Sequence, residues 1–248
     1  MASSSSAEAA LESGPVVKKA EVSATQFLKS PIVTVVVGQG DKVQSFPIYK
    51  DLLTAHSRFF RGCLNSGNNW KEAQTNVVNL KEEESCNAFE VIASWLLREP
   101  EPFKDIDCKT YTLGSLVDAY RLANYLGMEQ LKNDLVDYQR ARLRAEKQSP
   151  ALSMLHFLES HGLSQDPFYD FALKTYVRNY LSDKSSRCMD FCEEALRNGQ
   201  VMRDVLTKIH EYTCKKWLDP CKETGCVYHD HSGGSPCSAI RGGKRRRK

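Results

Sequence analysis

Long hydrophobic runs are missing from this sequence. No stretch of its 248 residues approaches the roughly 18–20 consecutive apolar residues that a membrane-spanning helix requires. The first ten residues, MASSSSAEAA, have neither the basic start nor the apolar core of a secretory signal. These two absences predict an intracellular protein that is not inserted in a membrane.

Fingerprints of catalysis are also missing. The glycines of segment 38–40 are followed neither by a third glycine nor by the Gly-Lys-Ser/Thr sequence of a phosphate-binding loop, so they favour a hairpin turn. Cys63 with His56, and Cys188 with Cys192, lack a neighbouring carboxylate or oxyanion donor. Cysteine is among the residue types most often buried, so core packing explains these pairs more simply. The sequence therefore predicts a protein that is not an enzyme.

Basic residues are concentrated at the C-terminal end. The chain has 34 basic and 31 acidic residues, and six of the basic ones lie in 241–248. Without those six, 28 basic residues face 31 acidic ones, so the rest of the chain is mildly acidic. The basic run ends with five consecutive residues: Lys244, Arg245, Arg246, Arg247 and Lys248.

That basic run is typical of a nuclear-import signal, and its alternative is a solvated tail. No aromatic residue is interleaved with it, so we expect no sequence-specific recognition of nucleic acid. The protein is therefore expected in the nucleus and the cytoplasm. Nine cysteines without an export signal predict reduced thiols, with metal ligands as the exception.

The first half of the chain has the spacing of a β-hairpin followed by helices. A β-branched run at 32–37, a turn at 38–41 and alternating apolar residues at 43–48 predict two strands. Apolar residues then recur every three or four positions through 52–64, which predicts short helices. The elements expected next are a loop at 65–76, a strand at 75–80, a helix at 89–97, a connector at 104–112 and two helices at 113–127 and 128–147.

Residues 46–60 carry a resemblance to a known family. Their pattern reads Phe46-x-Ile48-Tyr49-Lys50-x-Leu52-Leu53-x-x-x-Ser57-x-Phe59-Phe60. This pattern resembles the signature of the BTB/POZ domain, and the similarity extends over 32–138. The whole chain looks like a fungal-type member of that family with a helical C-terminal extension. Tyr49 occupies the position where the family commonly has histidine.

The resemblance implies an α+β fold, in which a small mixed sheet is clad by helices, and a function in protein–protein interaction. A hydrophobic-x-Glu motif at this place in the family engages cullin scaffolds of ubiquitin ligases, and Trp70 and Glu72 match that motif. We therefore predict Trp70, Glu72 and Tyr49 as partner-binding residues. The alternative for Trp70 is that its ring packs on Phe59 or Phe60 and only fixes the loop.

Beyond residue 147 the pattern is entirely helical. Ser149 and Pro150 interrupt the preceding charged helix, which places a domain boundary there. The predicted organisation is a disordered lead at 1–29, a BTB/POZ domain at 30–147, a helical unit at 150–217 and a Cys/His-rich segment with the basic tail at 218–248. Helices are expected at about 151–161, 167–181, 186–197 and 201–216.

The Cys/His-rich segment contains a candidate metal site. Cys226, His229, His231 and Cys237 offer the sulfur and nitrogen ligands that zinc prefers, and Cys221 is a substitute ligand. Four candidate ligands favour one structural zinc ion over a catalytic one. The alternative is an unstructured tail with free thiols.

Two functions follow from these patterns. The first is a substrate adaptor for a cullin-type ubiquitin ligase, and the second is a nuclear scaffold or transcriptional cofactor with a zinc-stapled basic tail. Both require a protein partner. We expect a monomer rather than a homodimer, because Tyr49 replaces the common histidine and the lead at 1–29 offers little apolar material for a swapped strand.

Overall fold

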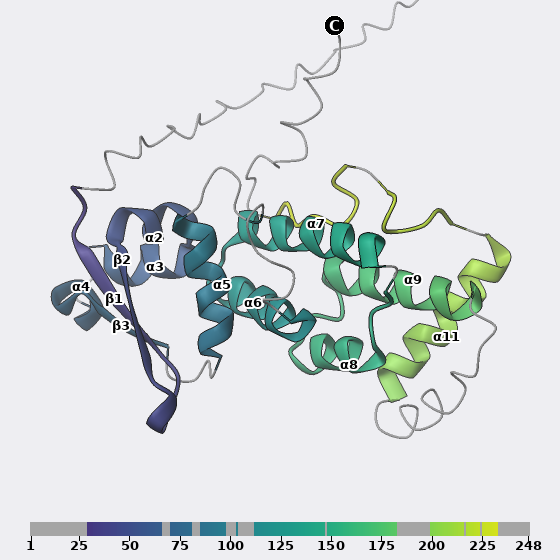
Figure 1. The fold of residues 1–248 in the computed structure, drawn as a ribbon, viewed down its shortest axis with the longest axis horizontal. Helices are drawn as coiled ribbons and strands as arrows, with labels where there is room; N and C mark the ends of the chain where they lie inside the picture. Colours follow the sequence, from purple (N-terminus) through teal and green to yellow (C-terminus); the bar gives the residue numbers. More distant parts are fainter. Residues whose placement is uncertain are drawn as a thin grey trace, which may run out of the picture.

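The computed structural model combines a small sheet with helices (Figure 1). It describes residues 29–65, 70–80, 85–97, 103, 112–146, 148–182, 199–215, 217–223 and 225–232. Several predictions lie outside these residues: the lead up to residue 28, the connector at 104–111, the helix at 186–197 with Cys188 and Cys192, Cys237 and the basic run at 244–248. The α+β class expected from the sequence is confirmed within the described ranges.

The sheet has three strands in the order β2-β1-β3. β1 (Ile32–Val37) pairs antiparallel with β2 (Gln44–Tyr49) and parallel with β3 (Val77–Leu80), so the sheet is mixed as expected. Side chains alternate between the faces of a strand, and Val33, Val35 and Val37 of β1 are fully buried. This face of the sheet packs against α5 (Cys86–Leu97), where Phe46 of β2 contacts Phe89.

A turn at 38–43 joins β1 to β2 and includes the 3-10 helix η1 (Gly40–Lys42). Gly38 has φ +98°, and a Cβ atom there would lie 2.4 Å from the carbonyl oxygen of Lys42. Only glycine fits this backbone conformation and this space. The interpretation of these glycines as a hairpin turn is therefore confirmed.

Short helices follow the hairpin. α2 (Lys50–His56) and α3 (Arg58–Leu64) were expected, but the predicted loop at 65–76 is wrong for 71–75. Those residues form α4 (Lys71–Thr75), which ends because Asn76 adopts the left-handed conformation at φ 53° and donates its N–H to the Glu72 carbonyl. The polar composition that suggested a loop belongs to a helix that is exposed on most of its surface.

α6 (Leu113–Tyr125) and α7 (Glu129–Glu146) form the predicted helical pair. Gly127 separates them at φ +63°, and the N–H of Met128 donates to the Ala123 carbonyl at 2.9 Å. This is the Schellman arrangement, which ends a helix at a left-handed glycine. The predicted helix end at Gly127 is therefore confirmed.

Ser57 connects this turn to α3. Its hydroxyl accepts from the N–H of Phe60 at 3.1 Å as the cap of α3 and donates to the Leu126 carbonyl at 2.6 Å. A helix cap and a helix end, 69 residues apart in sequence, thus share one buried hydroxyl.

The remaining described helices lie farther from the sheet: α8 (Leu152–Ser160), α9 (Pro167–Ser182) and α11 (Gly199–Cys214). In Figure 1 the sheet lies at one end of an elongated molecule, and α9 with α11 lies at the other. The boundary expected after residue 147 falls between α7 and α8. Buried hydrophobic residues on both sides of it form one connected core. Among the described residues, no helix has the length and apolarity needed to cross a membrane.

Candidate functional site

Residues 217–223 and 225–232, here called the C-terminal strap, return from α11 across the helices (Figure 1). The strap first follows α9. Asp219 Oδ2 lies 3.3 Å from Arg178 Nη1, the Cys221 thiol lies close to Thr175, and Tyr228 packs on Phe171 with ring centroids 5.3 Å apart. The contacted positions of α9 are spaced by three and four residues, so they belong to one face of the helix.

The strap then lies along α7 with the same periodicity. The Tyr228 ring faces the Arg140 guanidinium at 5.7 Å, and His229 Nε2 lies 3.0 Å from Asp137 Oδ1. The N–H of Asp230 donates to the side chain of Asn133 at 2.8 Å. The Asn133 amide donates back to the Asp230 carbonyl at 3.0 Å. The strap is therefore a docked part of the fold, and the alternative of an unstructured tail is wrong for these residues.

A buried lysine ties the strap to the helical core. Lys132 is 3% exposed, and its ammonium donates at 2.9 Å each to Asn124, Asp166 and Asp230. Burying a charge is costly unless it is paired and hydrogen-bonded, and here all three donors of the ammonium are used. Asp166 also accepts a hydrogen bond from the hydroxyl of Tyr120. Lys132 thereby links α6, α7, the α8–α9 turn and the strap.

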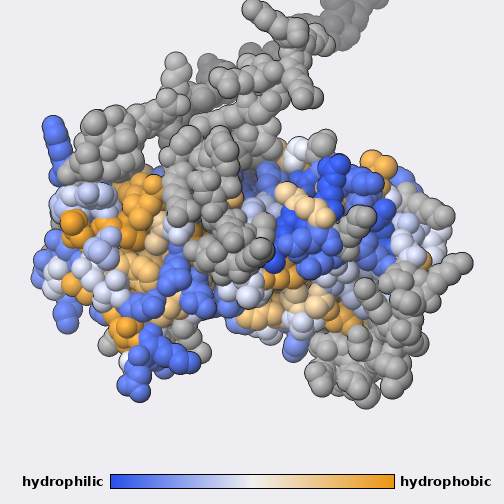
Figure 2. All heavy atoms as spheres, viewed as in Figure 1, coloured by the Kyte–Doolittle hydropathy of each residue, from blue (hydrophilic) through white to orange (hydrophobic). Residues whose placement is uncertain are grey.

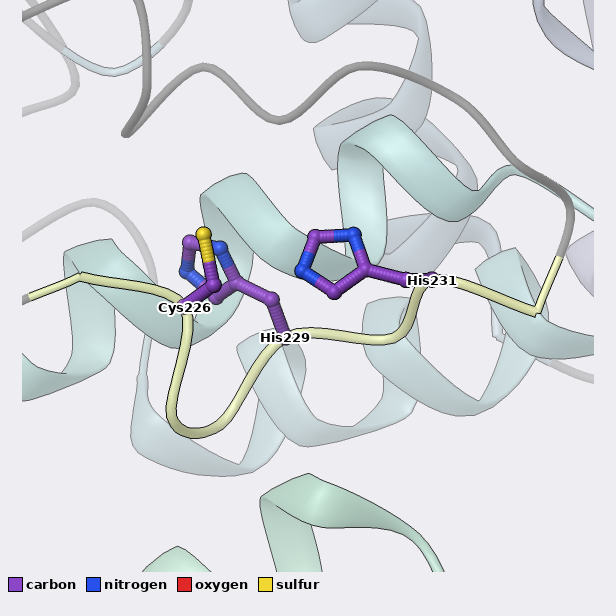
Figure 3. Close-up of side chains that lie close together, drawn as sticks. All are labelled: Cys226, His229 and His231. Carbon is purple, nitrogen blue, oxygen red and sulfur yellow. The ribbon is translucent and has the colours of Figure 1, made fainter. Parts of the chain in front are cut away.

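The strap brings three of the predicted metal ligands together. Candidate ligand atoms of Cys226, His229 and His231 all lie within 4.8 Å of one another. Figure 3 shows the Cys226 sulfur beside a ring nitrogen of His229, with a ring nitrogen of His231 directed toward them. His229 is buried, Cys226 is half-buried and His231 is exposed, so an ion can approach from the solvent side.

The other two predicted ligands differ from these three. Cys221 does not belong to the cluster, since its thiol faces Thr175 on α9. Burial, and after it the charge of Asp219, raises the pKa of Cys221, which disfavours the thiolate that a metal requires. Cys237 lies outside the described residues. A thiolate and two imidazoles form a donor set that suits zinc.

The predicted partner-binding residues lie at the sheet end of the molecule. Trp70 immediately precedes α4 and is 58% exposed, so more than half of its surface is open to solvent. Glu72 is half-buried in the first turn of α4. Tyr49 ends β2, immediately before α2, and is half-buried opposite Ile32 of β1.

α3 connects these residues to further aromatic surface. Burial, and after it the charge of Glu72, raises the pKa of the Cys63 thiol, so the Glu72 carboxylate acts on this position of α3. Phe59 lies one helical turn before Cys63 and contacts Tyr125, which is 52% exposed, with ring centroids 5.4 Å apart. Figure 2 shows hydrophobic residues gathered over the region of α2 and α3.

The pair of Cys63 and His56, which the structure describes, does not resemble a catalytic dyad. The raised pKa of Cys63 disfavours its reactive thiolate. His56 packs edge-on against Trp95 with centroids 5.0 Å apart. The pair of Cys188 and Cys192 lies outside the described residues.

Sequence reasoning missed the strap-binding face of α7. The signal was present as polar residues at helical spacing within an otherwise core-facing helix: Lys132, Asn133, Asp137 and Arg140. A polar stripe of this kind can bind a distant polar segment as well as face solvent.

No protein-family model matches the chain, and a search of the curated proteins finds no match.

Proposed function

We propose that the protein is a non-catalytic interaction module of the BTB/POZ type that serves as substrate adaptor for a cullin-type ubiquitin ligase. The observation that carries this proposal is the 58% exposure of Trp70 next to Glu72 at the start of α4. A large aromatic side chain that is exposed on the surface has the character of a binding hot spot. The residues also match the hydrophobic-x-Glu pattern in the family that the sequence resembles.

The surroundings of Trp70 support a binding surface. On α3, Phe59 contacts the exposed ring of Tyr125, and Cys63 one turn later is close enough to Glu72 to feel its charge. Aromatic anchors with a carboxylate at the rim have the composition of a protein interface. The mixed sheet and the helices that follow it are compatible with the BTB/POZ fold.

An affinity capture from cells tests the proposal. Tagged wild-type protein should retain a cullin, and the double variant Trp70→Ala, Glu72→Ala should lose it. The matched control is Leu206→Ala, because Leu206 is exposed to a similar extent (53%) but lies on α11. Equal retention of the cullin by the double variant and the wild type would contradict this assignment of the surface.

We further propose that Cys226, His229 and His231 hold one structural zinc ion, with Cys237 as the predicted fourth ligand. Purified protein should contain one zinc per chain, and His231→Gln should remove it without unfolding the protein, because His231 is exposed. Cys237→Ser should lower the zinc affinity at least about tenfold if Cys237 is a ligand. An unchanged affinity would assign the fourth position to another group.

The nuclear scaffold or cofactor function remains the alternative proposal. It rests on the basic run at 244–248, which lies outside the described residues, and on the mildly acidic body that precedes it. Import into the nucleus is compatible with either function.

A further inference from the structure

The sheet has two outer edges, because β1 lies between β2 and β3. Within the described ranges, no further strand pairs with the backbone groups of β2 and β3 that point away from β1. Open N–H and C=O groups at the edge of a sheet can pair with an extended segment of another protein. The two edges differ in whether they can do so.

The edge formed by β2 is blocked. The N–H of Lys50 donates to the Pro31 carbonyl at 2.8 Å, so these two opposite residues form a hydrogen-bonded pair. Such pairs alternate along an antiparallel ladder, and the backbone groups of Ser45 and Pro47 therefore point away from β1. Pro47 is exposed and has no N–H, so a strand added to β2 would lack that donor.

The edge formed by β3 has a complete pairing position at Asn79. The N–H of Thr34 donates to the Asn76 carbonyl at 2.9 Å, which fixes the alternation of the parallel ladder. By this alternation the backbone of Val78 bonds to β1, and the N–H and C=O of Asn79 point outward. Asn79 is exposed, and no described residue bonds to its backbone. Of the two edges, β3 is thus the one that can accept a strand.

β3 also adjoins the surface proposed to bind a partner. Trp70 immediately precedes α4, Glu72 lies in its first turn, and β3 begins two residues after α4 ends. α4 has only five residues, so it is roughly 8 Å long. The N–H of Val77 donates to the Thr75 hydroxyl at 3.3 Å, which ties the start of β3 to the end of α4. Figure 1 shows α4 and β3 together at the sheet end of the molecule.

We infer that an extended segment of the partner bound at Trp70 and Glu72 adds to β3 as a fourth strand and pairs with the backbone of Asn79. This inference rests on the proposed function and gives the same partner a second contact. β3 has four residues, and the N–H of Val77 is already bonded, so the edge supplies only a few hydrogen bonds. Very short edge strands resist pairing on their own. The strand is therefore added only when the contact at Trp70 holds the partner in place.

Amide hydrogen exchange of the full chain, free and bound to a purified cullin N-terminal region, tests the inference without any substitution. The Asn79 amide should exchange rapidly in the free protein and at least about tenfold more slowly in the complex. The Ser45 amide on the β2 edge is the internal control and should exchange equally fast in both. Unchanged exchange at Asn79 in the saturated complex would overturn the inference.

Calorimetry with variants measures the same contact as an affinity. Asn79→Pro removes the outward N–H and leaves the bonds between β3 and β1 in place. It should bind the cullin region about fivefold more weakly than Asn79→Ala, which loses the same side chain but keeps the N–H. Ser45→Pro removes the corresponding N–H on the β2 edge and should bind like the wild type.

Equal affinities of Asn79→Pro and Asn79→Ala would overturn the strand addition. If Trp70→Ala still lost binding in that case, the proposed function would stand without it. A wild-type chain that binds no cullin region would overturn the proposed function and this inference together.

Discussion

The side chains of Lys132 and Asp230 meet at 2.9 Å although 98 residues separate them in the chain. Asp166 approaches the same ammonium at the same distance, so one buried cation pairs with two carboxylates from different elements. This arrangement makes the strap part of the folded body. It also places the cluster of Cys226, His229 and His231 on a fixed support.

Lys132→Met should therefore destabilise the protein by about 3–5 kcal/mol, because it leaves Asp166 and Asp230 as uncompensated charges. The free energy of unfolding in urea measures this effect. Lys222→Met is the control on the strap, since Lys222 is largely exposed and lies 3.9 Å from Asp219. It should cost less than about 1 kcal/mol. Similar losses for both variants would contradict the account of Lys132.

The hairpin turn gives a second stability prediction. Gly38→Ala should cost about 3 kcal/mol or more, because the added Cβ would lie 2.4 Å from a backbone oxygen at φ +98°. Gly40→Ala meets no atom within 4 Å at φ +57°, so only the left-handed strain of roughly 1–2 kcal/mol applies. Thermal unfolding of the two variants should rank them in that order, and the reverse order would show that the turn differs from the one described.

Much of this fold could be predicted from the sequence, because the elements concerned are specified by local patterns. The β-branched run of β1, the alternation of β2 and the apolar stripe of α5 each belong to one continuous segment. α4 was missed because its four polar residues and one alanine form no apolar stripe, and its end depends on the left-handed Asn76.

The candidate metal site could be predicted only in part. The donor types and the spacing of Cys226, His229 and His231 are visible in the sequence. The contact of His229 with Asp137 is not, because it depends on how the strap packs on α7. Contacts between polar side chains that are far apart in sequence produce no regular spacing in the strap, so the sequence alone does not predict them.

The basic tail supplies a prediction about location. Deleting Lys244–Lys248 should move a tagged protein from the nucleus to the cytoplasm, because a run of basic residues is the feature that import recognises. Fluorescence microscopy of the intact and shortened proteins measures the change. An unchanged nuclear signal would exclude this function for the tail.

The protein is expected to be a monomer in solution. Light scattering of the full chain at micromolar concentration should give the mass of one chain at every dilution. Tyr49 lies half-buried at the end of β2, where the BTB/POZ family that the sequence resembles commonly has histidine. A dimer mass that persists on dilution would assign the protein to the self-associating branch of the family it resembles.

The central claim is that Trp70 and Glu72 form the contact with a cullin scaffold, and calorimetry with a purified cullin N-terminal region tests it most directly. Wild-type protein should bind, and Trp70→Ala should weaken binding by at least about 30-fold, which corresponds to the roughly 2 kcal/mol of a hot-spot residue. Glu72→Ala should also weaken it, whereas Leu206→Ala should bind like the wild type. The account is contradicted if the wild-type protein shows no binding, or if Trp70→Ala binds with unchanged affinity.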